Sequence, residues 1–169
     1  MRVVGYVRES ADPSHRHSAF SQQEQLRRYV ADRGHRLVAV TSDTRVPGQP
    51  TTRDGYRSLL GIVASGAVDA VLIPGIETFS SDAIVQEIIL WDLRNRGVRV
   101  VSTEASDHVV LDPDLDLDPS RMVIRDVLER VEEHIDLTGR IDVPATVADG
   151  DVMVHIIAAD AAEDLNPVS

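Results

Sequence analysis

Short apolar runs and amphipathic segments alternate along the first hundred residues of the chain. Four short runs of mainly apolar, often β-branched residues predict strands, near residues 2–7, 37–40, 70–73 and 98–101. The segments between them carry apolar residues at helical spacing and predict helices, over about 21–33, 53–65 and 81–96. Strands that alternate with helices in this way predict right-handed crossovers between parallel strands. The expected fold class is α/β, a three-layer, doubly wound and mostly parallel sheet formed by residues 1–104.

Polar residues mark the expected starts of two of these helices. Ser21 and Glu24 have the spacing of a capping box, in which a serine and an acid three residues later satisfy backbone N–H groups. Ser80 or Ser81 is expected to cap the third helix.

The pattern changes after residue 104. The segment from Asp107 to Asp118 contains five aspartates, counting both ends, and predicts a solvated acidic linker over residues 105–118. A long helix is expected over residues 119–140, and residues 141–169 form an acidic tail to which no role is assigned.

The long helix carries a narrow apolar seam with steps of four, three and four residues, made by Ile124, Leu128, Val131 and Ile135. Two interpretations stay open. The seam packs on its own domain, or it pairs the helices of two copies in a homodimer through residues 119–137.

Composition narrows the function classes. The 169 residues carry a net charge of −11, and all basic residues are arginines that end at Arg140. Averaged over the whole chain, a negative charge of this size disfavours binding to nucleic acid. The chain has no cysteine, and it has neither an apolar run of membrane-spanning length nor a signal-peptide pattern. We expect a cytoplasmic protein with no membrane association, and we interpret His15 and His17 as part of a solvated loop rather than as metal ligands.

Candidate chemistry appears where the first strand ends. Arg8 and Ser10 follow this strand at its carboxyl end, where ligands collect in open α/β sheets. A serine two residues after an arginine suits a nucleophile beside a phosphate-binding cation. The alternative is an ordinary polar strand end.

Further residues at matching separations extend this pattern over about residues 1–140. The chain resembles the catalytic domain of the resolvase/invertase serine recombinases. The pieces that carry the resemblance are Tyr6-Val7-Arg8-Glu9-Ser10, then Ser18, Gln22 and Leu26, then Asp43 and Gly48, then Arg53-Asp54-Gly55-Tyr56, and Asp69 before the third strand.

The resemblance implies a DNA strand-exchange chemistry. Ser10 would attack a DNA phosphodiester to give a phosphoserine link to the 5′ end and a free 3′ hydroxyl, without metal or other cofactor. Arg8 and Arg53 would contact the phosphate, and Asp69 would orient the arginine cluster. The resemblance also implies DNA-binding roles for Tyr6, Asp43 and Arg45.

The chain departs from the family at the positions that complete the phosphate site. Thr78 and Ser81 stand where the family carries arginines, and Pro47 replaces a serine before Gly48. Losing one preorganised contact to developing charge costs about 10²-fold in rate, so two losses predict impaired cleavage.

Two functional hypotheses therefore remain. One is a serine-recombinase-like domain with a degenerate active site, which binds DNA weakly unless a partner supplies further contacts. The other is a non-catalytic dimeric module for protein interaction or regulation on the same fold. No DNA-binding module is recognisable after the long helix, and the helix itself carries more acidic than basic residues.

Overall fold

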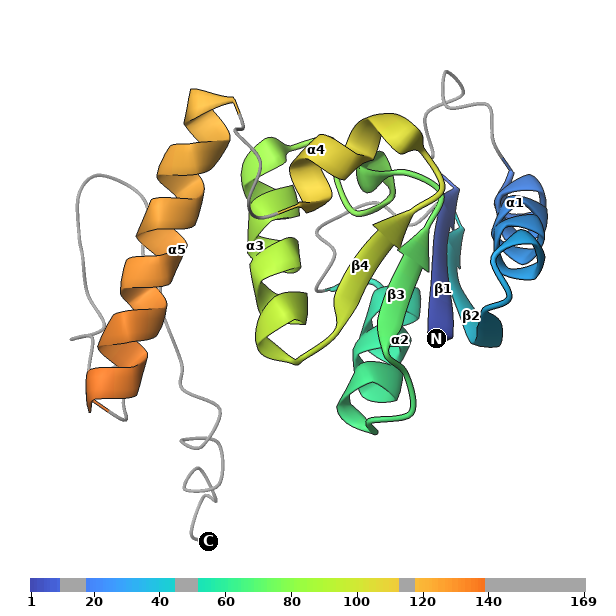
Figure 1. Cartoon of the computed structure of the whole chain (residues 1–169), viewed down its shortest axis with the longest axis horizontal. Helices are drawn as coiled ribbons and strands as arrows, with labels where there is room; N and C mark the ends of the chain where they lie inside the picture. The colour runs from blue at the N-terminus through green and yellow to red at the C-terminus, as the bar shows by residue number, and fades with distance from the viewer. Residues whose placement is uncertain (10–17, 45–51, 113–117, 139–169) are drawn as a thin grey trace, which may run out of the picture. The chain divides into compact units, whose positions relative to one another are not determined.

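The computed structural model describes residues 1–9, 18–44, 52–112 and 118–138 (Figure 1). The chain divides into two compact units, Met1–Arg125 and Asp126–Ser169. The elements of the first unit, in chain order, are β1 (Arg2–Glu9), α1 (Ala19–Asp32), β2 (Arg36–Thr44), α2 (Asp54–Ala64), β3 (Ala70–Ile73), η2 (Ile76–Thr78), α3 (Ala83–Asn95), β4 (Arg99–Ser102), η3 (Ala105–Asp107), α4 (His108–Leu111) and the start of α5 (Pro119–Thr138).

The strands form one four-stranded sheet in the order β2-β1-β3-β4. All neighbouring strands are parallel, with Val3 opposite Leu37 on one side and opposite Ala70 on the other. The predicted parallel, doubly wound α/β fold is confirmed. The direction of winding changes between β1 and β3, and ligands bind outside the carboxyl ends of strands at such a point.

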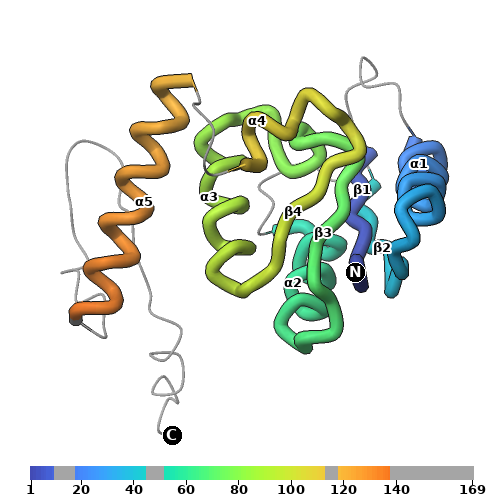
Figure 2. The backbone as a smooth tube through the Cα atoms, in the orientation of Figure 1, coloured from blue at the N-terminus to red at the C-terminus, as the bar shows by residue number. Residues whose placement is uncertain are grey.

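Alternating side chains of β1 serve the two faces of the sheet. Val4 and Tyr6 pack in the core beneath α2 and α3, whereas Val3 and Val7 pack beneath α1. Figure 2 shows α1 on one side of the strands and α3 on the other. Because both faces are covered, the central strands read as nearly continuous apolar runs.

The helix caps differ from those expected. Helix α1 begins at Ala19, because Ser18, three residues before the expected cap Ser21, caps it and accepts from the Ser21 backbone N–H at 3.2 Å. Helix α3 is capped by Asp82, which accepts from the N–H groups of Ile84 and Val85. A carboxylate at this position also interacts favourably with the helix dipole.

The expected solvated linker is partly folded. Residues 105–111 form η3 and α4, and Asp107 is buried. Its carboxylate accepts from the Ile76 N–H at 2.8 Å and from the Ser102 hydroxyl at 2.6 Å. The prediction of a solvated loop is therefore wrong at Asp107, which ties the segment after β3 to the segment after β4.

Helix α5 begins at Pro119, where Asp118 accepts from the backbone N–H and the hydroxyl of Ser120. Its residues up to Arg125 belong to the first unit, and residues 126–138 are the described part of the second. Among the described helices, none is long and apolar enough to cross a membrane.

The start of α2 lies unusually close to β2, which explains the glycine in Arg53-Asp54-Gly55. A Cβ atom at Gly55 would lie 2.4 Å from the backbone oxygen of Ser42. The neighbouring atoms are backbone, so a side chain here requires the helix to move away from the strand.

We predict that Gly55→Ala lowers the free energy of unfolding by about 1–3 kcal/mol, because it overpacks this contact. Gly61→Ala in the same helix is the matched control, since a Cβ there meets nothing within 4 Å. It should raise stability by about 0.5–1 kcal/mol through helix propensity. Urea unfolding of both variants measures the difference, and equal effects would contradict the close-contact explanation.

Candidate functional site

Three polar side chains converge at the carboxyl ends of β1 and β2 and at the start of α2. Arg8 and Asp43 lie opposite each other in the register of β1 and β2. Arg53 is the residue immediately before α2 and is buried. We call Tyr6, Arg8, Asp43 and Arg53, together with the backbone of residues 78–79, the carboxyl-edge site.

Asp43 organises this site. It is only 3% exposed, and its carboxylate accepts from the Tyr6 hydroxyl at 2.9 Å. It also accepts from the backbone N–H groups of Gly55 at 2.8 Å and Tyr56 at 3.0 Å. Arg53 occupies the N-cap position of α2 without a side-chain cap, so Asp43 of β2 satisfies the first N–H groups of the helix in its place.

Tyr6 is the fully buried member of the site. Its ring stacks on Phe79 at 6.0 Å between centroids and meets Tyr56 edge-on at 5.8 Å. Burial raises the pKa of Tyr6 far above its ordinary value, while a hydrogen bond from Arg53 opposes the shift. The phenol therefore stays protonated and donates to Asp43.

The side-chain hydrogen bonds of Tyr6 and Asp43 are made within the chain. The Tyr6 hydroxyl donates to Asp43, and the Asp43 carboxylate also accepts from the N–H groups of Gly55 and Tyr56. Within the carboxyl-edge site these two residues therefore hold β1, β2 and the start of α2 together, and their expected contact with DNA stays a prediction.

Arg53 and Arg8 supply positive charge to the same place. The Arg53 guanidinium donates to the Phe79 carbonyl at 3.0 Å. The Arg8 Nε is buried and, among the described residues, has no hydrogen-bond partner. Burial lowers the pKa of Arg8, and the nearby positive charge of Arg53 lowers it further.

Gln22 of α1 fixes the backbone of Arg8. Its amide accepts from the Arg8 N–H at 3.1 Å and donates to the Arg8 carbonyl at 2.8 Å. On the β3 side of β1 this contact replaces strand pairing, because β1 pairs with β3 only over residues 3–5. The sequence did carry a signal for it, since Gln22 is a polar residue in line with the buried Leu26 and Val30 of the helix.

Asp69 lies elsewhere and has a different partner from the one expected. It accepts from the backbone N–H and the guanidinium of Arg2, both at 2.7 Å, at the amino ends of the strands. Arg8 and Arg53 lie at the opposite ends, so this placement does not serve to orient them. The hydrogen bond from the Arg2 side chain, with that from the Arg2 N–H, lowers the pKa of Asp69 to about 2.

The remaining predicted residues divide into two groups. Ser10, Arg45, Pro47 and Gly48 lie outside the residues that the structure describes. Thr78 ends η2 and is buried, whereas Ser81 is exposed just before α3. Both stand near the Phe79 carbonyl that Arg53 contacts, and neither brings a charge.

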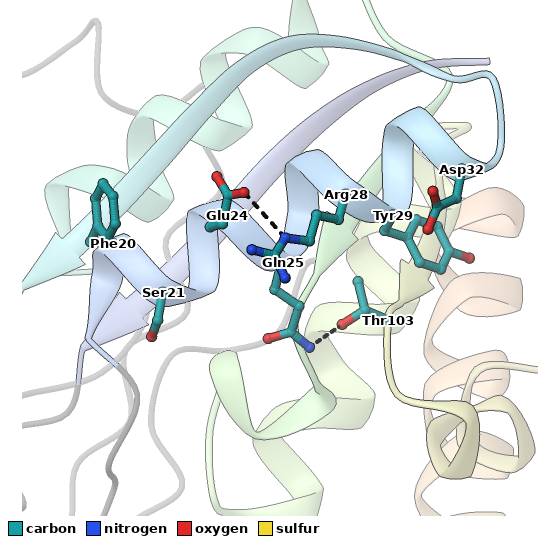
Figure 3. Close-up of a pocket in the computed structure, with 8 residues that line it drawn as sticks. All are labelled: Phe20, Ser21, Glu24, Gln25, Arg28, Tyr29, Asp32 and Thr103. Carbon is teal, nitrogen blue, oxygen red and sulfur yellow. Dashed lines mark hydrogen bonds and ion pairs between the residues drawn. The ribbon is translucent and has the colours of Figure 1, made fainter.

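A separate pocket of about 550 Å³ lies along α1 (Figure 3). Gln25 closes one wall by donating to the Thr103 hydroxyl at 2.7 Å, and Glu24 pairs with Arg28 beside it. Neither Arg8 nor Arg53 lines it, so it is distinct from the carboxyl-edge site. Across the described part of the chain, no group of three or more potential metal ligands occurs.

Comparison with known proteins supports a single family. The family model described as "Resolvase, N terminal domain" matches residues 3–135. No curated protein matches the chain.

Solved structures of serine recombinase catalytic domains share the fold. The N-terminal catalytic domain of TP901-1 integrase is 17% identical, with a TM-score of 0.58 over 82% of this chain and 99% of that one. A resolvase family site-specific recombinase from Streptococcus pneumoniae is also 17% identical, with a TM-score of 0.56 over 82% and 93%. The C-terminal catalytic domain of ISC1926 TnpA, an IS607-like serine recombinase, is 21% identical, with a TM-score of 0.53 over 82% and 87%.

The Arg2–Asp69 contact generates a pH prediction. The pKa of Asp69 is about 2 in the folded chain, below its value of 3.8 when unperturbed, so the unfolded state binds more protons between these values. The contribution of this pair to stability is therefore complete above about pH 4 and is lost as the pH falls towards 2.

Carbon-13 NMR titration of the Asp69 carboxyl group should give a midpoint near 2 in the wild type, and a higher one in Arg2→Gln. Arg57→Gln removes an exposed arginine elsewhere and should leave the Asp69 midpoint unchanged. A wild-type midpoint near 3.8 would contradict the ion pair.

Proposed function

Because the chain belongs to the resolvase family, we propose that it binds a DNA phosphodiester at the carboxyl-edge site and that its own strand cleavage is impaired. The family match and the fold shared with recombinase catalytic domains support the general class of the protein. The proposal adds that the ligand is a DNA phosphodiester and that the chain cleaves DNA poorly by itself.

One observation carries the ligand assignment. Arg8 and Arg53 are close enough for the charge of Arg53 to lower the pKa of Arg8, and the Arg8 Nε lacks a partner among the described residues. Asp43, a buried carboxylate nearby, already accepts three hydrogen bonds. An anion placed at Arg8 would supply the missing acceptor and offset the repulsion between the guanidinium groups.

The expected reaction places Ser10 two residues beyond Arg8. The serine oxygen would form a bond to phosphorus, the bond from phosphorus to the 3′ oxygen would break, and the departing oxygen would take a proton. The negative charge that grows on the phosphoryl oxygens in this step requires preorganised cations. Arg8 and Arg53 supply two, but Thr78 and Ser81 supply none, which supports impaired cleavage.

The alternative, a non-catalytic dimeric module, has its own support. Val123, Val127 and Val131 recur every four residues along α5, and they are 64%, 53% and 39% exposed. This exposed column shares Val131 with the predicted seam and favours pairing of two copies through residues 119–137. A homodimer is compatible with either function.

We expect the protein to bind a mixed-sequence DNA duplex at low salt, with affinity that falls steeply as salt rises. Arg53→Gln should weaken binding by about tenfold and reduce the salt slope by about one, because it removes one phosphate contact. Fluorescence anisotropy measures both quantities.

Arg57→Gln is the matched control, because it removes the same charge from an exposed position on α2. It should change binding little. Arg53→Lys keeps the charge and should fall between the wild type and Arg53→Gln. Absence of binding by the wild type at low salt, or equal losses in Arg53→Gln and Arg57→Gln, would reject the phosphate site and favour the protein-interaction module.

Cleavage should return when the missing charge is restored. We predict that Ser81→Arg, alone or with Thr78→Arg, raises the yield of a covalent protein–DNA adduct by about 10²-fold or more. Ser81 is exposed, so this substitution should not disturb the core. Denaturing gels of a labelled, nicked duplex measure the adduct, and Ser10→Ala in the same background should abolish it. An adduct that persists without Ser10 would disprove the assigned nucleophile.

A further inference from the structure

The backbone after η2, at Phe79 and Ser80, accepts hydrogen bonds from two side chains. Arg53 donates to the carbonyl of Phe79, and Gln86 of α3 donates to the next carbonyl, that of Ser80, at 2.6 Å. Gln86 is 2% exposed, so its side chain lies in the protein interior. The backbone carbonyls of Phe79 and Ser80 are therefore held between Arg53 and helix α3.

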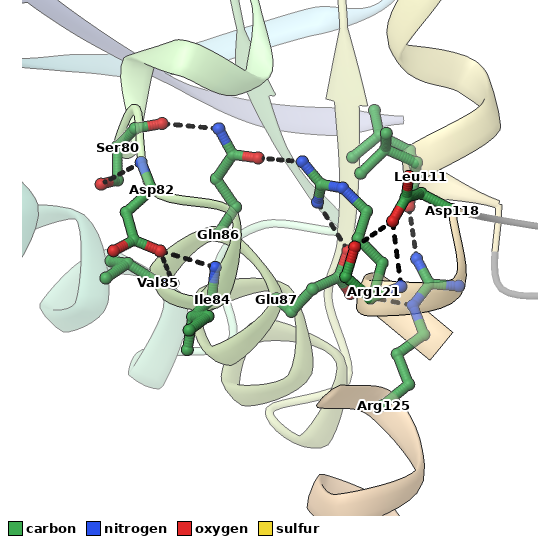
Figure 4. Close-up of polar contacts among 12 residues, drawn as sticks. Ser80, Asp82, Ile84, Val85, Gln86, Glu87, Leu111, Asp118, Arg121 and Arg125 are labelled. Atoms are coloured by element: carbon green, nitrogen blue, oxygen red, sulfur yellow. Dashed lines mark hydrogen bonds and ion pairs between the residues drawn. The ribbon is translucent and has the colours of Figure 1, made fainter. Parts of the chain in front are cut away.

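Gln86 is itself held by the start of α5. Figure 4 shows its side chain between Ser80 and Arg121, whose guanidinium donates to the Gln86 side-chain oxygen. The same guanidinium donates to Glu87 at 2.7 Å. A rotation of Arg121 would thus break its hydrogen bonds to Gln86 and to Glu87 together.

Glu87 makes this arrangement stable. Its side chain is 1% exposed, and its second oxygen accepts from the Arg125 Nε at 2.8 Å. Arg125 also donates to the Val110 carbonyl at the end of α4. A buried carboxylate is costly unless paired, and α5 supplies both of these cations. We call Gln86, Glu87, Arg121 and Arg125 the arginine clamp.

We infer that Gln86 and Arg121 are positioning residues for Arg53, and that they couple the start of α5 to the carboxyl-edge site. The path runs from Arg121 through Gln86 to the Ser80 carbonyl, and from the adjacent Phe79 carbonyl to Arg53. The two carbonyls belong to rigid peptide planes that join at the Ser80 Cα, so a displacement of the Ser80 carbonyl also moves the plane of the Phe79 carbonyl unless the Ser80 φ and ψ angles compensate. The placement of the start of α5, residues 119–125, thereby influences the direction of the Arg53 guanidinium, and where this directs phosphate binding the inference rests on the proposed function.

The first test needs no DNA. In the full chain, the Arg53 Nη1–Hη resonance, which belongs to the group that donates to the Phe79 carbonyl, is assigned by its loss in Arg53→Gln. Gln86→Met cuts the path and leaves both ion pairs of Glu87 in place, so it should shift this resonance and speed its exchange with water by about tenfold. Gln25→Met removes an amide donor on α1 and should leave the resonance unchanged. An unchanged Arg53 resonance in folded Gln86→Met would overturn the inference.

Arg121→Lys gives an independent variant if Gln86→Met does not fold. The ammonium keeps a positive charge beside Glu87, but it lacks the fork that reaches Gln86 at the same time. It should perturb the Arg53 resonance in the same direction. A folded Arg121→Lys protein with a wild-type Arg53 signal would also overturn the inference.

A double-mutant cycle separates positioning from a general loss of stability. Gln86→Met should raise the Kd for the DNA duplex by about fivefold to tenfold in the wild-type background, and by less than twofold in the Arg53→Gln background. Equal effects in both backgrounds would mean that Gln86 does not act through Arg53. If the wild type binds no DNA, the proposed function fails, and the NMR experiment still decides the coupling.

Discussion

The carboxyl-edge site depends on one buried carboxylate. Asp43 lies near the end of β2, and its three hydrogen bonds join the Tyr6 hydroxyl of β1 to the first N–H groups of α2. A carboxyl group with so little exposure is stable only when its acceptor atoms are used, and these three donors all come from the chain itself. The position of α2, and with it the burial of Arg53, follows from this interaction.

The hydrogen bonds to Asp43 also require that α2 lies close to β2. The Gly55 N–H reaches Asp43 because no side chain separates the helix start from the backbone of Ser42. The aromatic rings of Tyr6, Tyr56 and Phe79 then close the core beneath. The motif Arg53-Asp54-Gly55-Tyr56 thus contributes a cation, a close contact and a core ring within one helical turn.

A second buried carboxylate organises the far side of α3. Glu87 binds two arginines from the start of α5, while Arg94 and Arg125 bind the last carbonyls of α4. The two carboxylates are alike in that each is buried and each accepts hydrogen bonds from elements distant in sequence. They differ in their donors: Asp43 receives neutral N–H and O–H groups, and Glu87 receives guanidinium groups. The turn at residues 79–81 lies between the two networks.

Element type and order were predictable from the sequence, because strand and helix periodicity is a local property of the chain. The family motifs likewise singled out Arg8 and Arg53, which the structure places at the carboxyl end of β1 and immediately before α2, and their contact with phosphate stays a prediction. The caps were less predictable, since Ser18 and Asp82 compete with nearby serines for the same role. Only the tertiary structure decided which polar residues are buried and what they bind. Asp69 pairs with Arg2, Asp107 enters the core, and Gln86 meets Arg121, because such contacts depend on register and packing between segments far apart in the chain.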